Sequence, residues 1–313
     1  MGELEDESVI NSVEAKSIAG MKTKSNTSTP GIPISTVFFR VILFVLFLIC
    51  GLTVLIFGTS YYDRFPTNTS GIFKIGSSAL FLVTVILARK IPLLKPYWRV
   101  MYAFFVASMV NVVTWYFAIY LREGLFEMLQ VSTAATPGMT FAKLLEASLT
   151  VGTILVLVKL SGDDLASVYI RKGNLRWGLT IGFLAMVNLT ASAILIAASG
   201  ERLLEAMIPN LHWWLAFSLA NGFMEELWFR GLFLQRLQPI IGAGGAVWMT
   251  SIWFGILHVF AVYVSGIGAL VFALLVFTLG FAFALLMQKT KNIWGATLFH
   301  AASDFHWFIA FGF

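Results

Sequence analysis

Apolar residues occur in long runs along most of this 313-residue chain, and short polar segments separate the runs. A helix needs about 20 apolar residues to cross the ~30 Å hydrocarbon core of a bilayer. The pattern therefore predicts an all-α, polytopic transmembrane helix bundle with about eight or nine spans. The runs lie near residues 37–59, 75–88, 100–121, 141–159, 178–199, 211–237, 247–264, 266–287 and 293–313. The second extends towards Gly71 if Lys74 snorkels, and the fourth is the weakest because it begins with Lys143 and Glu146.

Three segments outside the apolar runs have their own patterns. Residues 1–36 are charged and then rich in Ser, Thr and Pro, which predicts a disordered cytoplasmic tail. Residues 161–178 mix charges with apolar residues at near-helical spacing, which fits a short helix in the membrane interface and equally a plain basic loop. Gly242, Ala243, Gly244 and Gly245 are expected to connect the sixth and seventh spans.

The composition agrees with a membrane protein. Hydrophobic residues make up 58% of the chain and charged residues 12%, against about 25% charged in ordinary soluble domains. The net charge of +5 does not indicate a nucleic-acid partner, because the basic residues lie between apolar runs rather than on one face. The single cysteine, Cys50, lies inside an apolar run and forms no internal disulfide.

The basic residues also predict the orientation, since cytoplasmic loops retain Lys and Arg. With nine spans and the N-terminus in the cytoplasm, 16 of the 21 Lys and Arg residues fall on the inner side. The five on the outer side are Arg64, Lys74, Arg122, Lys143 and Arg202. If the fourth run does not cross, this asymmetry largely disappears, so the count favours that span as well.

Ionisable residues within the C-terminal runs are the candidate functional residues, because each costs at least about 2.5–3.5 kcal/mol at mid-membrane. They are Glu225, Glu226, Arg230, His258, His300, Asp304 and His306. Glu225, His258, His300 and Asp304 fall within about 5 Å of the midpoints of their spans at the helical rise. Three helices are therefore expected to bring polar groups to one depth.

Helical phase separates these residues into faces. Glu226 and Arg230 are four apart and are expected to form an ion pair, which would be structural. Glu225 points elsewhere, along a stripe with Asn221 and Ser218. The pairs His300 with Asp304 and Phe254 with His258 also share faces, whereas His306 lies on another face and is expected to pack.

Such a set can hydrolyse an amide with activated water. A buried carboxylate serves as general base, an imidazole holds the water, and a polar donor stabilises the oxyanion. Two His and a carboxylate are also the ligands of catalytic zinc sites, although the HExxH spacing is absent, so zinc remains a rival. A scaffold or immunity-type protein and a proton-coupled carrier are further alternatives, the last without the paired broken-helix pattern of carriers.

Three motifs resemble the CPBP family of type II CAAX prenyl endopeptidases and bacteriocin-processing (Abi-like) enzymes, which are intramembrane glutamic proteases. EExxxR matches Glu225 to Arg230, FxxxH matches Phe254 to His258, and HxxxN matches His300 to Asp304 with Asp in place of Asn. The resemblance covers about residues 205–313. We therefore divide the chain into a tail (1–36), N-terminal transmembrane helices (37–200) and a CPBP-like catalytic core (201–313).

The resemblance implies that Glu225 activates water with His258 as partner, and that His300 and residue 304 line the oxyanion site. Glu226, Arg230, Asn221 and Phe254 would support them. An ionised Asp304 would repel an oxyanion, so it is either protonated, or it orients His300 or holds a metal. No cofactor is predicted, with zinc as the exception above. The expected partners are the lipid bilayer and a CAAX-type, leader or other membrane-associated peptide, in the plasma (inner) membrane of a prokaryote.

Overall fold

A computed structural model describes residues 34–59, 66–200, 207–261 and 266–312, and this part of the chain is all-α. Its ten α-helices are α2 (Ile34–Leu52), α3 (Thr67–Lys90), α4 (Trp98–Tyr120), α5 (Arg122–Met128), α6 (Thr136–Leu160), α7 (Leu175–Ser199), α9 (Leu211–Glu225), α10 (Leu234–Ala261), α11 (Ile267–Thr290) and α12 (Trp294–Phe311). Two π-helical turns, η1 (Thr53–Phe57) and η5 (Glu226–Gly231), follow α2 and α9.

The predicted tail, residues 1–36, lies outside the described residues except for 34–36, which begin α2. Residues 40–313 form one compact unit, and the rest of this description concerns that unit. Within it, the boundary expected at residue 200 stays a prediction.

The membrane character expected from the apolar runs is confirmed. Among the described residues, seven helical stretches are long and apolar enough to cross a membrane. They contain α2, α3, α4, α6, α7, α10 and α11. The sixth predicted run begins with α9, which has only 15 residues, and the ninth corresponds to α12. Both helices carry polar residues. The number of spans and their orientation remain predictions.

One detail of the predicted spans is wrong. The sixth run was expected to continue as one helix to residue 237, but the chain turns at Leu232 and Phe233, and α10 begins at Leu234. Hydropathy does not reveal this turn because the residues that form it are apolar and fully buried. The second span extends beyond Gly71 as expected, because α3 begins at Thr67. Lys74 is buried within it: it is 3% exposed and donates to Ser70 Oγ at 2.7 Å.

Gly242 divides α10, as the glycine-rich link predicted. Its φ of 84° and ψ of 162° lie in a region that suits glycine alone, so a short helical segment precedes it and a longer one follows. The longer segment carries Phe254 and His258.

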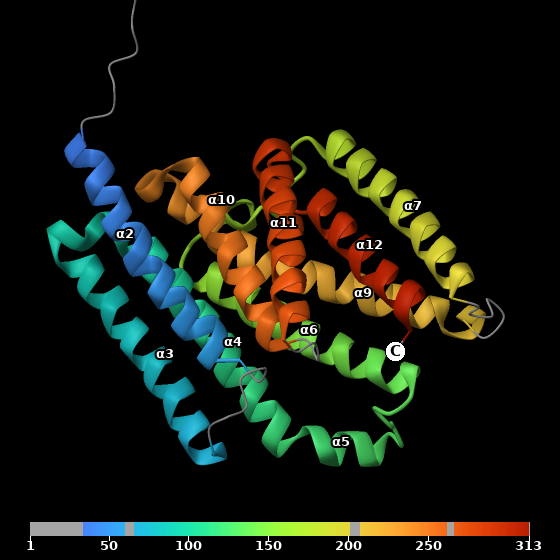
Figure 1. Ribbon diagram of the computed structural model, residues 1–313. Helices are drawn as coiled ribbons and strands as arrows, with labels where there is room; N and C mark the ends of the chain where they lie inside the picture. Colours follow the sequence, from blue (N-terminus) through green and yellow to red (C-terminus); the bar gives the residue numbers. More distant parts are fainter. Residues whose placement is uncertain (1–33, 60–65, 201–206, 262–265, 313) are drawn as a thin grey trace, which may run out of the picture. The chain divides into compact units, whose positions relative to one another are not determined.

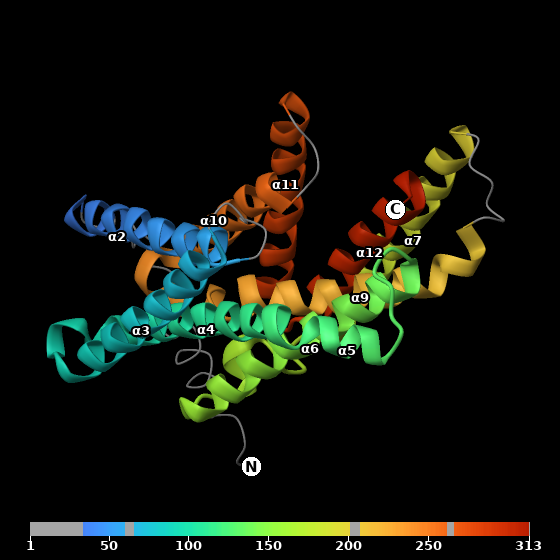
Figure 2. The ribbon, with the colours of Figure 1, turned by 90° about the horizontal axis from the view of Figure 1, so that it is seen from below.

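The helices that carry the polar residues pack in the C-terminal half of the unit. α12 lies between α7 and α9, and α10 packs along α11 (Figures 1 and 2). α6 contacts both α4 and α9, and α3 packs along α4. The candidate functional residues therefore lie on helices that neighbouring helices hold in position.

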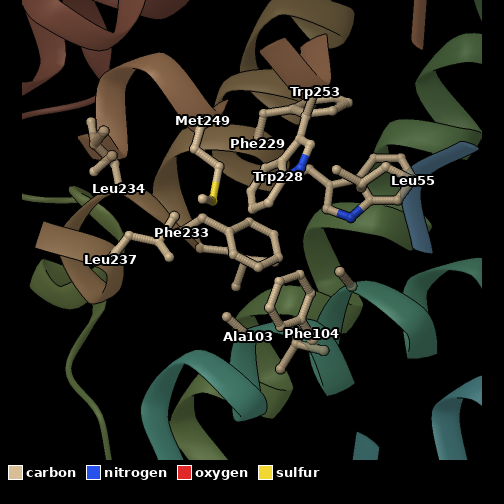
Figure 3. Close-up of a cluster of buried hydrophobic side chains, with 14 of the residues drawn as sticks. Leu55, Ala103, Phe104, Trp228, Phe229, Phe233, Leu234, Leu237, Met249 and Trp253 are labelled. Atoms are coloured by element: carbon tan, nitrogen blue, oxygen red, sulfur yellow. The ribbon is translucent and has the colours of Figure 1, made fainter. Parts of the chain in front are cut away.

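A cluster of buried aromatic side chains holds α4, η5 and α10 together (Figure 3). The ring of Phe233 lies 5.0 Å from both Phe104 and Trp253, measured between centroids. Trp253 Nε1 donates to the carbonyl of Leu48 at 3.1 Å, so α2 joins the same cluster. Burying such rings contributes about 1.5–3 kcal/mol each, and their packing fixes the segment that carries Glu226 and Arg230.

The segment between α6 and α7 forms a short 3₁₀ helix, η3 (Leu165–Val168). Its position relative to the lipid interface stays a prediction. Val168 and Tyr169 are fully buried within the protein. The Tyr169 carbonyl accepts from Ile293 N at 3.0 Å, and burial raises the pKa of the Tyr169 phenol to about 12. This segment therefore anchors the start of α12.

Candidate active site

Four segments bring the ionisable residues together. Glu225 ends α9, Glu226 and Arg230 belong to η5, His258 lies near the end of α10, and His300 and Asp304 lie one turn apart on α12. All are buried or half-buried.

Glu226 and Arg230 form the expected ion pair. The distance from Arg230 Nη1 to Glu226 Oε1 is 2.8 Å, and both side chains are fully buried. The guanidinium carbon lies 4.1 Å from the centroid of the Phe254 ring, which shields it by a cation–π contact. Gly280 of α11 leaves room for this guanidinium, because a Cβ at that position would lie 2.4 Å from Arg230 Nη2.

His300 connects the two glutamates. Its Nδ1 lies 2.9 Å from Glu226 Oε1, and its Nε2 lies 3.6 Å from Glu225 Oε2. A carboxylate oxygen accepts, so Nδ1 is the donor to Glu226. Helical phase places the two glutamates on diverging faces. Both nevertheless reach one ring, because they approach its opposite nitrogens.

His258 is oriented by the backbone of its own helix. Its Nδ1 lies 2.8 Å from the carbonyl oxygen of Phe254, which can only accept, so Nδ1 carries the proton. In the neutral ring Nε2 therefore holds a lone pair, and it lies 4.0 Å from Glu225 Oε2. Phe254 thus contributes its carbonyl to His258 and its ring to Arg230.

Glu225 Oε2 is the atom on which both histidines converge. It is buried and has no hydrogen-bond partner among the described residues. Its distances to the two Nε2 atoms, 3.6 Å and 4.0 Å, exceed a direct hydrogen bond and are within the span of one bridging water.

Asp304 lies beside this centre. Its Oδ2 accepts from Asn221 Nδ2 at 2.9 Å, and its Oδ1 is 3.7 Å from His300 Nε2. Its side chain is 23% exposed, against 4% for that of His300. Asp304 therefore faces the edge of the site and contacts the same imidazole nitrogen as Glu225.

A comparison with protein families identifies this region. The model described as "Rce1-like: Type II CAAX prenyl endopeptidase Rce1-like" matches residues 207–306. The chain carries an Rce1-like domain. The resemblance read from the three motifs is thereby confirmed, and this family is one of membrane proteases. No curated protein and no solved structure matches the chain.

Every candidate residue named above lies within the Rce1-like domain. The domain makes up about one third of the chain. α2 to α7 lie outside the match, although α4 packs directly on η5 and α10 through the aromatic cluster. No motif in these helices predicted a function.

His306, the last residue of the match, takes no part in the site. Its Nδ1 lies 2.9 Å from the carbonyl of Leu189 and 3.2 Å from Ser192 Oγ, both on α7. This agrees with the expectation that it packs on another face of its helix.

Two residues of α11 that border the site were missed by sequence reasoning. Phe283 stacks on the His300 ring with centroids 5.0 Å apart and planes at 14°, and Gly280 borders Arg230. Both lie in an apolar run with no charge to mark them. A glycine in the middle of a long apolar helix was the only available signal, since glycine permits close approach.

In the described residues, no group of three or more His, Cys, Asp or Glu side chains is arranged to hold a metal ion. The two histidines and Glu225 that raised the zinc alternative face one another through Nε2 of each ring. The Nδ1 of each ring is hydrogen-bonded to a neighbouring oxygen, as is also usual for histidines that bind a metal.

Proposed function

We propose that this protein is an intramembrane endopeptidase that hydrolyses a peptide bond with water activated by Glu225. The observation that carries the proposal is the position of Glu225 Oε2, which is buried, has no hydrogen-bond partner in the described part of the chain, and lies between the Nε2 atoms of His258 and His300. The family match supports the reaction class.

The water would be held by Glu225 and His258. Water has two O–H donors, and the Glu225 carboxylate and the His258 Nε2 lone pair are two acceptors 4.0 Å apart. When both protons are engaged, a lone pair of the water oxygen is free to attack the substrate carbonyl. Glu225 accepts the proton as the new C–O bond forms and returns it to the amide nitrogen as the C–N bond breaks.

His300 would stabilise the oxyanion. Its Nδ1–H is committed to Glu226, so its doubly protonated form presents Nε2–H towards the reacting carbonyl. Arg230 and Glu226 hold the ring in place from behind, and Asp304 faces the same Nε2 at 3.7 Å. We assign Asp304 to orienting the His300 imidazole rather than to binding the oxyanion, because two negative charges would repel each other.

The substrate class follows from the family name. We propose a peptide with a prenylated cysteine near its C-terminus, cleaved at the membrane, as the family's CAAX designation implies. The predicted topology, with the N-terminus in the cytoplasm, and a prokaryotic plasma membrane as the location are parts of the same proposal.

The test is cleavage of a farnesylated peptide ending in Cys-Val-Val-Ala by the protein in liposomes, with the products identified by mass spectrometry. Glu225→Gln should lower kcat by a factor on the order of 10²–10⁴, as expected for loss of a general base. Glu123→Gln on α5 is the matched control, because Glu123 is exposed and lies outside the Rce1-like domain.

The alternatives give different results in the same assay. Activity that disappears on exhaustive chelation and returns with zinc would support the metal-dependent protease. Full activity of Glu225→Gln would remove the base from the mechanism. A scaffold protein would cleave nothing, and both Glu225→Ala and His258→Ala would complement a deletion strain.

A further inference from the structure

A cavity of about 540 Å³ lies among α3, α4, α6 and the α9–η5 segment, mostly outside the Rce1-like domain. Its lining includes the cations Lys74, Arg122 and Lys143, and one carboxylate, Glu146. Among the described residues, these three cations and one carboxylate are the charged groups of the lining.

These cations are the exceptions in the charge distribution of the chain. Five basic residues were assigned to the outer side, and three of them line this one cavity. The other two, Arg64 and Arg202, lie outside the described residues. Positive charge placed inside a membrane protein is costly and marks functional sites, and an anionic ligand offsets that cost.

The buried groups of the cavity are held in place. Lys74 donates to Ser70 Oγ at 2.7 Å and is 3% exposed, and Lys143 pairs with Glu146 at 2.7 Å. The indole Nε1 of Trp228 is buried without a hydrogen-bond partner among the described residues. The described lining therefore combines two cations held by neighbouring side chains, Lys74 and Lys143, with the indole N–H of Trp228, which has no partner there.

The cavity runs along the catalytic helix. Phe217 of α9 and Trp228 of η5 both line it. Glu225 is one turn before Trp228. The Lys143 ammonium lies 5.4 Å from the centroid of the Phe217 ring, which places this cation at the Phe217 end of the cavity.

From Glu225 to the turn of Phe217 is about 12 Å along the helix, the length of three to four extended residues at about 3.3 Å each. We propose that this cavity binds the part of the peptide substrate that follows the scissile bond, and that Lys74, Arg122 and Lys143 bind its C-terminal carboxylate. This inference rests on the proposed protease function. It names a binding subsite whose cations all lie in helices that the family match does not cover.

The experiment compares two farnesylated peptides ending in Cys-Val-Val-Ala, one with a free carboxylate and one with a carboxamide. For the wild type, the amide should raise KM by about tenfold or more with little change in kcat, because a charge-assisted contact is lost. In Lys74→Met and Lys143→Met the ratio of KM for the amide to KM for the acid should fall to near one. Lys143→Arg should retain most of the wild-type ratio. Lys90→Met on α3 and Lys159→Met on α6 are controls, since both lysines are exposed outside the cavity.

Binding separates this inference from the protease proposal. Dissociation constants of both peptides for the Glu225→Gln variant report the subsite even if no cleavage occurs. Equal affinities for acid and amide, or a preference that survives both Lys→Met substitutions, would overturn the inference. An anionic lipid that co-purifies with the wild type and is lost from both variants, together with equal peptide affinities, would instead assign the cavity to a lipid headgroup.

Discussion

Asn221 of α9 donates its Nδ2–H to Asp304 Oδ2 of α12 at 2.9 Å. In the family motif, Asn occupies the position of Asp304. In this chain, the side-chain amide of Asn221, on α9, lies beside that position. The pair joins two helices that pack directly on each other and each carry a candidate catalytic residue. A departure from the motif is thus accompanied by a specific polar partner.

Exchange of these two residues tests whether they act as a unit. Asn221→Asp should lower kcat/KM by about 10–100-fold, because two carboxyl groups then face each other and the hydrogen bond is lost. Asp304→Asn should stay near the wild type, since the amide oxygen can still accept. The double variant Asn221→Asp/Asp304→Asn reverses donor and acceptor and should recover most of the loss, with a coupling energy of about 0.5–3 kcal/mol. Additive effects in this cycle would show that the two residues act independently.

The depth and spacing of the polar residues were predictable from the sequence. Ionisable residues are rare in membrane spans, so Glu225, His258 and His300 were conspicuous at one depth. A spacing of four residues was sufficient to predict the pair of Glu226 with Arg230, which the structure contains.

Other features left no trace in hydropathy or spacing. The turn at Leu232 and Phe233 consists of apolar residues and resembles a continuing helix. The contact of both glutamates with His300 depends on how α12 crosses α9, which a single-helix phase argument does not contain. The cavity requires the tertiary packing of four helical segments, so its cations appeared in the sequence only as scattered outer-side charges.

Replacement of Gly280 by alanine, the smallest side chain, should destabilise the protein. In Gly280→Ala the new Cβ would lie 2.4 Å from Arg230 Nη2 and 2.9 Å from Phe254 Cδ1, so the ion pair or the ring must move. We expect a loss of about 1–3 kcal/mol of stability from this overpacking and a parallel loss of cleavage. Thermal unfolding in detergent measures the former. Gly152→Ala on α6 is the control, because nothing lies within 4 Å of its added Cβ, and equal stability of the two variants would contradict the close approach.

Single and double substitutions of the buried pair Glu226 and Arg230 should affect stability and activity differently. Glu226→Leu leaves the Arg230 charge unpaired in the interior and should cost about 3–5 kcal/mol. The double variant Glu226→Leu/Arg230→Met removes both charges and should recover most of that stability. It should remain at least about tenfold less active, because His300 Nδ1 has lost its acceptor and the ring is no longer held. A stable double variant with wild-type kcat would show that the pair has no positioning role.

The proposed topology is accessible to labelling because the chain has a single cysteine, Cys50. In a Cys50→Ala background, Ser132→Cys places a thiol in an exposed segment between α5 and α6, on the predicted outer side. Lys172→Cys places one in the exposed segment before α7, on the predicted inner side. A maleimide that does not cross membranes should label the first in intact cells and the second only after lysis. The reverse pattern would invert the orientation assigned from Lys and Arg, and would place the cationic cavity at the cytoplasmic end of the protein.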